Sequence, residues 1–200
     1  MNKTPIYPYH KVHGSLVEFA GFEMPLYYST IREEHMAVRE KVGIFDVSHM
    51  GRVLVEGRDS LPYLNHLTVN DVSKLKPGRC HYTLFCNEEG GVKDDFILSQ
   101  LGDESYLLVP NASNRVKDWE WMKKNVDGYD VSLENISDTT AMIAVQGPLA
   151  EKVLGEVFPE LPRRRFRLLL TDFQGERCMI SRTGYTGEDG FEVVLWLGGK

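Results

Sequence analysis

The chain has 200 residues, of which 42% are hydrophobic and 26% charged, a composition typical of a globular protein. Its formal net charge of -6 argues against nucleic acid as a partner, because phosphate binding requires a surplus of Lys and Arg. Three cysteines without CxxC spacing argue against a disulfide framework or a structural zinc site. With no segment of signal-peptide or membrane-span character, we expect a soluble, cytoplasmic protein of one large or two small domains.

The first clear element is a helix with a capping box. Thr30 is followed three residues later by Glu33, which predicts a helix that begins there and runs through Lys41. Residues 46–51 then read as a loop that enters a strand at residues 52–56.

The middle of the chain predicts two further helices among strands. Asp59 and Ser60 are expected to cap the first, and Ser113 the second, which carries Val116 on its apolar flank together with Trp119 and Met122. A third helix is expected over residues 149–154, after Pro148. Further strands are predicted at residues 82–86, 92–99, 105–109, 131–133, 140–145, 166–172, 178–182 and 191–197. Because strands outnumber helices and rarely alternate with them singly, the pattern favours an α+β fold with mostly antiparallel sheets flanked by helices.

Two adjacent aspartates interrupt one of these strands. Asp94 and Asp95 lie within an apolar run, where an uncompensated carboxylate is costly. Since side chains alternate along a strand, only one of the two can enter any one pocket. The connector at residues 87–91 predicts a β-hairpin with the strand that carries Tyr82. The pattern indicates either a functional carboxylate beside Tyr82 or aspartates that face solvent or a neighbouring backbone amide.

Residues 184–192 hold three glycines and three carboxylates beside a predicted strand. Their spacing is neither a dinucleotide fingerprint nor an EF-hand loop. A tight turn here can present Tyr185 and Glu192 to a neutral, nitrogen-rich ligand. His10 has no cysteine or carboxylate pattern around it, so we expect no metal site. The basic cluster at residues 163–167 is read as a solvated lead-in to a strand, with binding of an acidic protein as the alternative.

Six segments, in this order and spacing, resemble the aminomethyltransferase, or T-protein, family of the glycine cleavage system. They are residues 46–51, 82–83, 87–95, 111–113, 146–148 and 184–192. Each motif is weak alone, but six in register argue against a chance match. The resemblance covers essentially the whole chain from Thr4 onward.

The resemblance implies a folate-dependent transferase. Family members take the aminomethyl group from the lipoyl arm of the lipoylated H-protein, release ammonia, and pass the one-carbon unit to tetrahydrofolate. The family's essential aspartate falls on Asp95 rather than Asp94, and the resemblance implies that Asp95 orients the folate nitrogen and stabilises positive charge, or takes a proton. The implied folate-binding residues are Met50, Tyr82, Asp95, Asn111, Tyr185 and Glu192. Glu192 would accept two hydrogen bonds from the pterin, while Met50 and Tyr82 cover its apolar surface.

The family fold implies a first folate-binding domain made of residues 1–47 and 136–200, incomplete at its C-terminal end. Residues 48–135 would form an inserted second α+β domain that carries the aspartate hairpin. Family members continue beyond Lys200 with a further folate-contacting arginine and a C-terminal domain, so this chain resembles a C-terminally truncated member. The missing strands are expected to expose apolar surface that favours self-association.

Three alternatives remain open at this point. A folate-dependent demethylase on the same scaffold would share the folate pocket but not the lipoyl partner. A non-catalytic folate-binding fragment would bind without turnover. A purely structural oligomeric domain is less attractive, because a carboxylate in a buried strand gains nothing from packing.

Overall fold

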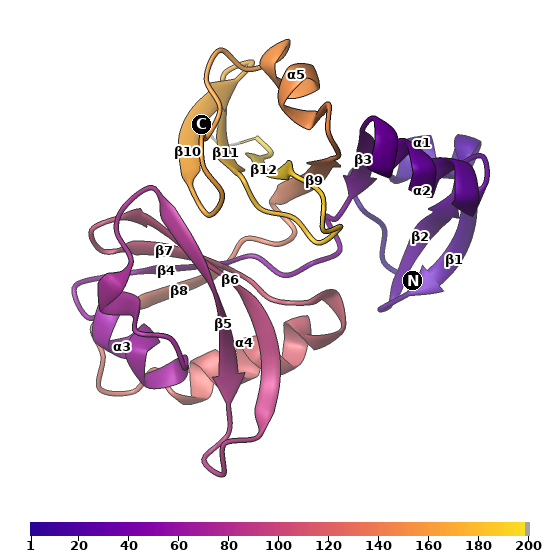
Figure 1. Cartoon of the computed structure of the whole chain (residues 1–200). Coiled ribbons are helices and arrows are strands. Elements are labelled where there is room, and N and C mark those ends of the chain that lie inside the picture. Colours follow the sequence, from indigo (N-terminus) through magenta and orange to yellow (C-terminus); the bar gives the residue numbers. More distant parts are fainter. Residues whose placement is uncertain (199–200) are drawn as a thin grey trace. The chain divides into compact units, whose positions relative to one another are not determined.

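The computed structural model describes residues 1–198 and separates into two compact units (Figure 1). The first unit contains residues 1–49 and the residues from 139 onward, and the second contains residues 50–138. The described strands form three sheets whose pairings are antiparallel, and short helices flank them. The predicted α+β class with mostly antiparallel sheets is therefore confirmed.

The first unit begins with two helices and a β-hairpin, drawn in indigo and violet in Figure 1. These elements are α1 (Tyr7–His13), β1 (Ser15–Phe19), β2 (Phe22–Tyr27) and α2 (Ile31–Glu40). The sequence pattern predicted only α2, because β1 is mostly exposed and β2 contains Pro25, a residue that disfavours a strand. Helix α2 begins where the capping box places it: Thr30 Oγ1 accepts the N–H of Glu33 at 3.2 Å.

The main sheet of the first unit has five strands in the order β10-β11-β12-β9-β3. Its elements are β3 (Gly43–Asp46), β9 (Thr140–Gln146), α5 (Ala150–Gly155), β10 (Leu168–Phe173), β11 (Glu176–Ser181) and β12 (Gly190–Trp196). Leu154 of α5 packs against Val145 of β9 and Phe191 of β12 in one buried cluster. Strand β3 was not predicted, since it is short and leaves Ile44 and Phe45 exposed. This sheet places β12, with Glu192, between two neighbouring strands.

The second unit is built on another five-stranded sheet, in the order β5-β6-β7-β4-β8. Its elements are β4 (Val53–Glu56), α3 (Ser60–Leu67), η1 (Val72–Lys74), β5 (Arg79–Cys86), β6 (Val92–Gly102), β7 (Ser105–Val109), η2 (Ala112–Asn114), α4 (Arg115–Lys124) and β8 (Ser132–Asn135). Figure 1 shows α3 and α4 beside this sheet. Leu64 of α3 and Met122 of α4 are fully buried in the same cluster as Phe96 of β6. The residues of β6 that point toward the helices therefore line the core of this unit.

Asp59 is the N-cap residue of α3 as predicted, but the predicted side-chain caps of α3 and α4 do not form. Asp59 does precede α3, but its carboxylate accepts the backbone N–H of Asp130 at 2.8 Å instead of capping the helix. Ser113 lies inside η2, and Asn114 is the residue before α4. Val116, expected on the apolar flank, is 76% exposed. Helical spacing alone could not show that a 3-10 turn precedes α4 and shifts its start by one residue or more.

The helices of residues 1–198 are all too short or too polar to cross a bilayer. Cys80, Cys86 and Cys178 are free thiols, and Cys80 and Cys178 are buried.

Candidate functional site

The aspartate hairpin forms as predicted from β5 and β6. The register pairs Phe85 with Asp94 and Leu84 with Asp95, so the two aspartates point to opposite faces of the sheet. At the tip, Gly90 adopts a φ of 80°, which glycine reaches without a steric cost. Tyr82 lies on the same face as Asp95, and its hydroxyl donates to Asp95 Oδ2 at 3.0 Å. The expectation that Tyr82 and one aspartate meet across neighbouring strands is thus confirmed.

Asp94 faces the helical side of the sheet and is 4% exposed. Its Oδ2 accepts the backbone N–H of Asn111 at 3.0 Å, and its Oδ1 accepts the side-chain amides of Asn111 at 3.0 Å and Asn114 at 2.5 Å. Burial alone would raise the pKa of Asp94. The contact with Asp118 and the hydrogen bonds from Asn111 and Asn114 outweigh burial and hold the pKa of Asp94 below its ordinary value. Asp94 is therefore an anchored carboxylate that accepts three hydrogen bonds from the protein.

Asn111 connects the two aspartates. It precedes η2, and its side-chain nitrogen donates to Asp94 Oδ1 at 3.0 Å and to the backbone carbonyl of Asp95 at 2.8 Å. One amide group thus fixes both the buried carboxylate and the backbone from which the Asp95 side chain projects. Through this bridge, the packing of the buried face determines where Asp95 points on the other face.

Met50 lies in the turn that leads from β3 to β4, and its side chain is half-buried. Its carbonyl oxygen accepts Nη1 of Arg52 at 2.8 Å, and Arg52 is fully buried. The same guanidinium donates from Nη2 to the carbonyl of Ser137. A buried cation satisfied by backbone carbonyls therefore fixes the backbone at Met50.

Glu192 is the corresponding carboxylate of the first unit. In β12 it pairs with Ala144 of β9 on one side and Ser181 of β11 on the other. The hydroxyl of Thr183 donates to Glu192 Oε2, and Thr183 Oγ1 lies 2.7 Å from Ser181 Oγ. Burial raises the pKa of Glu192 above its ordinary value, and the single bond from Thr183 offsets this only in part.

The loop before β12 carries Tyr185, which is 87% exposed. Gln146 is fully buried beneath this loop and donates from Nε2 to the carbonyls of Thr183 at 3.1 Å and Phe191 at 3.2 Å. Its Oε1 lies where a side chain would sit: a Cβ added at Gly184 would come within 1.8 Å of that oxygen. The absence of a side chain at Gly184 therefore allows the loop to close on Gln146.

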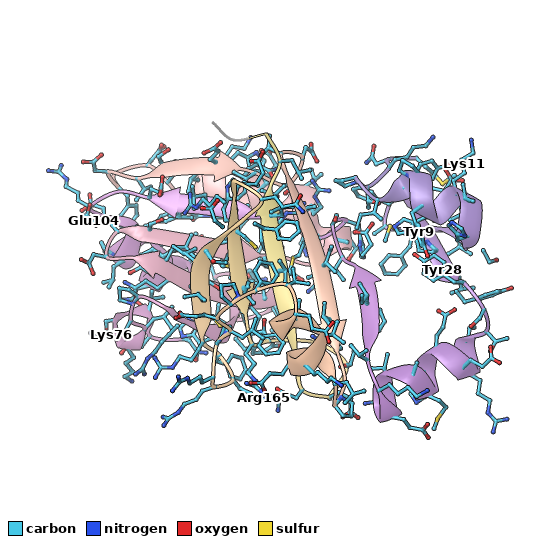
Figure 2. The ribbon with its side chains drawn as sticks, turned by 90° about the horizontal axis from the view of Figure 1, so that it is seen from above. Tyr9, Lys11, Tyr28, Lys76, Glu104 and Arg165 are labelled. Atoms are coloured by element: carbon cyan, nitrogen blue, oxygen red, sulfur yellow. The ribbon has the colours of Figure 1, made fainter. Side chains whose placement is uncertain are left out.

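A separate cluster ties α1 to β3 and to Tyr28, the residue after β2. His10 Nε2 lies 2.7 Å from Asp46 Oδ2, and His10 Nδ1 lies 2.7 Å from the hydroxyl of Tyr28. Figure 2 shows Tyr28 near Tyr9, and their ring centroids are 5.8 Å apart. Burial would raise the pKa of Asp46, but bonds from Ser48, Thr4 and His10 outweigh it and lower that pKa. An ionised Asp46 can accept a hydrogen bond from an N–H at His10 Nε2.

The structure joins three of the predicted site residues, Tyr82, Asp95 and Asn111, into one hydrogen-bonded network. Met50 belongs to the same unit, whereas Tyr185 and Glu192 belong to the first unit. Three supporting residues were missed: Asn114, Asp118 and Thr183. Asn111, Asn114 and Asp118 follow one another at intervals of three and four, which would have marked one polar side of a helical segment. Among residues 1–198 no cluster of three or more His, Cys, Asp or Glu side chains is arranged to hold a metal ion.

The fold and these carboxylates define the class: an α+β chain of two antiparallel-sheet units, each with an acidic side chain held in an interior strand. The family described as the GCVT N-terminal domain matches residues 6–197. The chain therefore belongs to the GCVT N-terminal domain family.

Two comparisons support this assignment, and a third concerns the fold alone. An aminomethyltransferase of Geobacillus thermodenitrificans (strain NG80-2) is 46% identical over 198 residues, covering 96% of this chain and 54% of the relative. The crystal structure of glycine cleavage system aminomethyltransferase T from Bartonella henselae matches with a TM-score of 0.89 and 34% identity, covering 98% of this chain and 54% of that one. Heterotetrameric sarcosine oxidase from Corynebacterium sp. U-96 shares the fold alone, with a TM-score of 0.54 and 15% identity over 82% of this chain and 81% of that one. The chain spans about half the length of the curated relatives it matches.

Proposed function

We propose that the chain binds tetrahydrofolate and takes part in aminomethyl transfer in glycine cleavage. In this reaction the one-carbon unit passes from an aminomethyl-lipoyl H-protein to tetrahydrofolate, and ammonia is released. The observation that carries the proposal is the 46% identity to an aminomethyltransferase over 198 residues.

The proposed folate-binding residues occur in both units. From the second unit come Met50 and Tyr82, which would cover apolar pterin surface, and Asn111, which holds the backbone at Asp95. From the first unit come Tyr185 and Glu192. The raised pKa of Glu192 shows that the protein alone stabilises its ionised form poorly. N–H donors of a bound ligand would stabilise that ionised form further. The amidine-like edge of a pterin carries such donors.

Asp95 is the proposed catalytic residue. Its carboxylate is half-buried, and among the described residues its side chain takes a 3.0 Å hydrogen bond from Tyr82 and a longer one, 3.4 Å, from Asn111. It therefore keeps acceptor capacity for a reacting amine. Asp95 would orient the folate nitrogen that attacks the aminomethyl carbon. It would also stabilise the positive charge that develops there, or take the proton, as the bond to ammonia breaks.

The partners and location belong to the same proposal. The lipoylated H-protein would deliver the aminomethyl group, in a cytoplasmic, reducing compartment that suits three free thiols. Self-association is a further expectation: exposed Ile31, Ile44 and Phe45 line a groove of about 650 Å³ on the first unit. A monodisperse monomer in light scattering would count against self-association.

A transfer assay tests the proposed function. The chain is mixed with tetrahydrofolate and an aminomethylated lipoyl H-protein, and ammonia and methylenetetrahydrofolate are followed together. We expect equal amounts of both products, and a rate that falls about 100-fold or more in Asp95→Asn. Glu89→Gln, an exposed change at the hairpin tip, is the matched control and should leave the rate unchanged. Unchanged turnover in Asp95→Asn would remove the catalytic role of Asp95, and turnover of a methylated amine in place of the lipoyl donor would assign the chain to a demethylase.

A further inference from the structure

Asp118 of α4 is fully buried, yet no N–H or O–H donor of the described residues reaches either of its carboxyl oxygens. The group that does contact it is the carboxyl of Asp94 on β6. An ionised Asp118 would then be a buried charge facing a second one of the same sign. Such a charge is expensive, and two carboxylates in contact normally share one proton.

The two nearby cations do not supply the missing donor. Lys117 Nζ donates to the carbonyl of Lys93 at 2.5 Å, and Lys93 Nζ lies 4.3 Å from the ring centroid of Trp121. Both positive charges favour the ionised form of Asp118, but burial and the carboxyl of Asp94 act more strongly in the other direction. The balance raises the pKa of Asp118 to about 8.

Asp94 is the better place for the negative charge of this pair. It already accepts three hydrogen bonds from Asn111 and Asn114, whereas Asp118 accepts none from the described residues. A protonated Asp118 can donate a fourth bond to Asp94, which also satisfies the buried Asp118 hydroxyl. One proton placed on Asp118 therefore removes the repulsion between the two carboxylates and gives the Asp118 carboxyl a hydrogen-bond partner.

We propose that Asp118 is a positioning residue that keeps its proton at neutral pH and donates a hydrogen bond to Asp94. This bond thereby holds Asn111 against Asp95. The connection runs from Asp118 to Asp94, from Asp94 to Asn111, and from the Asn111 amide to the Asp95 carbonyl at 2.8 Å. The role in folate binding rests on the function proposed for Asp95, whereas the shared proton does not.

Two consequences follow when the proton leaves at alkaline pH. Asp94 and Asp118 then repel each other, and Asn111 loses the arrangement that supports Asp95, so folate affinity should fall through about pH 8. Because the folded-state pKa of Asp118 lies above its unfolded value, the stability linked to this group is fully present below the unfolded pKa. That stability is lost as pH rises through the folded pKa.

The first test locates the proton without any ligand. Carboxyl carbon-13 resonances of the aspartates are followed by NMR from about pH 3 to pH 9, with Asp118→Asn used to assign Asp118. A carboxyl that titrates near pH 8 and is missing from the spectrum of Asp118→Asn supports the inference. Titration of Asp118 below about pH 5 overturns it.

The second test separates a shared proton from simple packing. Asp118→Asn keeps a donor toward Asp94 at every pH, whereas Asp118→Leu removes it at similar volume. We expect the midpoint of thermal unfolding of Asp118→Asn to exceed that of the wild type by a margin that grows between about pH 5 and pH 8. The midpoint of Asp118→Leu should lie below those of both other proteins. An Asn variant whose margin does not change with pH overturns the inference.

Folate affinity supplies the functional readout. Tetrahydrofolate affinity of the wild type should decline above about pH 8, while Asp118→Asn should bind without that decline and Asp118→Leu should bind about 10-fold or more weakly at all pH values. Equal decline in wild type and Asp118→Asn overturns the positioning role. If the wild type does not bind folate at any pH, the proposed function fails, and the NMR titration alone decides whether Asp118 holds the proton.

Discussion

The two faces of the β5–β6 hairpin carry adjacent carboxylates in opposite situations. Asp94 faces the core and accepts three hydrogen bonds from Asn111 and Asn114, whereas Asp95 faces outward and accepts one 3.0 Å bond from Tyr82. The buried carboxylate has its acceptor capacity used by the protein, and the half-buried one keeps capacity for a ligand. Alternation along a single strand thus separates a carboxylate held by the core from one that faces away from it.

Glu192 in the first unit extends the comparison. Asp94 and Glu192 both project from interior strands of five-stranded sheets, but the pKa of Asp94 is lowered and that of Glu192 is raised. Burial would raise the pKa of both groups, so the number of donors decides the direction. Glu192 has one side-chain donor, Thr183, and Asp94 has three side-chain partners. A carboxyl buried with too few donors is one that a donor-rich ligand can stabilise.

The largest expected loss of folding stability follows a substitution on the core face of the β5–β6 hairpin. Asp94→Ala should lower the free energy of unfolding by about 3 kcal/mol, because it leaves the amides of Asn111 and Asn114 without their acceptor. Asp95→Ala, one residue along, is the matched control and should cost under about 1 kcal/mol. Urea titrations of both variants measure the difference. Equal losses of stability would mean that the hydrogen bonds to Asp94 contribute no more than those to Asp95.

A smaller effect is expected beneath the loop that precedes Glu192. Gly184→Ala should cost about 2 kcal/mol, because the new Cβ displaces Gln146 from the carbonyls of Thr183 and Phe191. Gly155→Ala, where a Cβ meets no atom within 4 Å, should be neutral or slightly stabilising in the same denaturant titration. A neutral Gly184→Ala would show that Gln146 does not hold the Thr183 side of the Glu192 site.

The smallest expected effect is on the pH dependence of stability, which has opposite signs for Glu192 and Asp94. Stability linked to Glu192, whose pKa is raised, is present below the unfolded pKa and is lost as pH rises through the folded pKa. Stability linked to Asp94, whose pKa is lowered, is present above the unfolded pKa and is lost as pH falls through the folded pKa. Glu192→Gln should therefore raise the midpoint of thermal unfolding relative to the wild type by a few degrees more at about pH 7 than at about pH 4.

Calorimetric scans at both pH values measure this difference. Glu160→Gln, an exposed change in the same unit, is the control and should give the same offset at both pH values. An offset for Glu192→Gln that shrinks as pH rises would contradict the raised pKa.

The sequence predicted the parts of this account that depend on local spacing. The capping box at Thr30, the hairpin and the opposite faces of Asp94 and Asp95 follow from patterns of a few residues. The donors to the carboxylates come from distant segments, such as Asn111 on Asp94, so single-strand periodicity could not reveal them. The burial of Asp118 is equally invisible in sequence, because it depends on α4 packing over the face of β6 that carries Asp94.

The elements that were missed share a physical cause. Strand β3 is short and exposes Ile44 and Phe45, strand β1 is mostly exposed, and strand β2 contains Pro25. Their positions are set by tertiary contacts, including the link between His10 and Asp46 at 2.7 Å. The local sequence propensity of a strand does not predict such contacts.

Isothermal titration of the 200-residue chain with tetrahydrofolate, in the absence of oxygen, measures whether Glu192 and Asp95 contribute to folate binding. We expect saturable binding that weakens about 10-fold or more in Glu192→Ala and also weakens in Asp95→Asn, with both variants still folded. No binding by a demonstrably folded chain, or binding that neither substitution changes, would contradict this expectation.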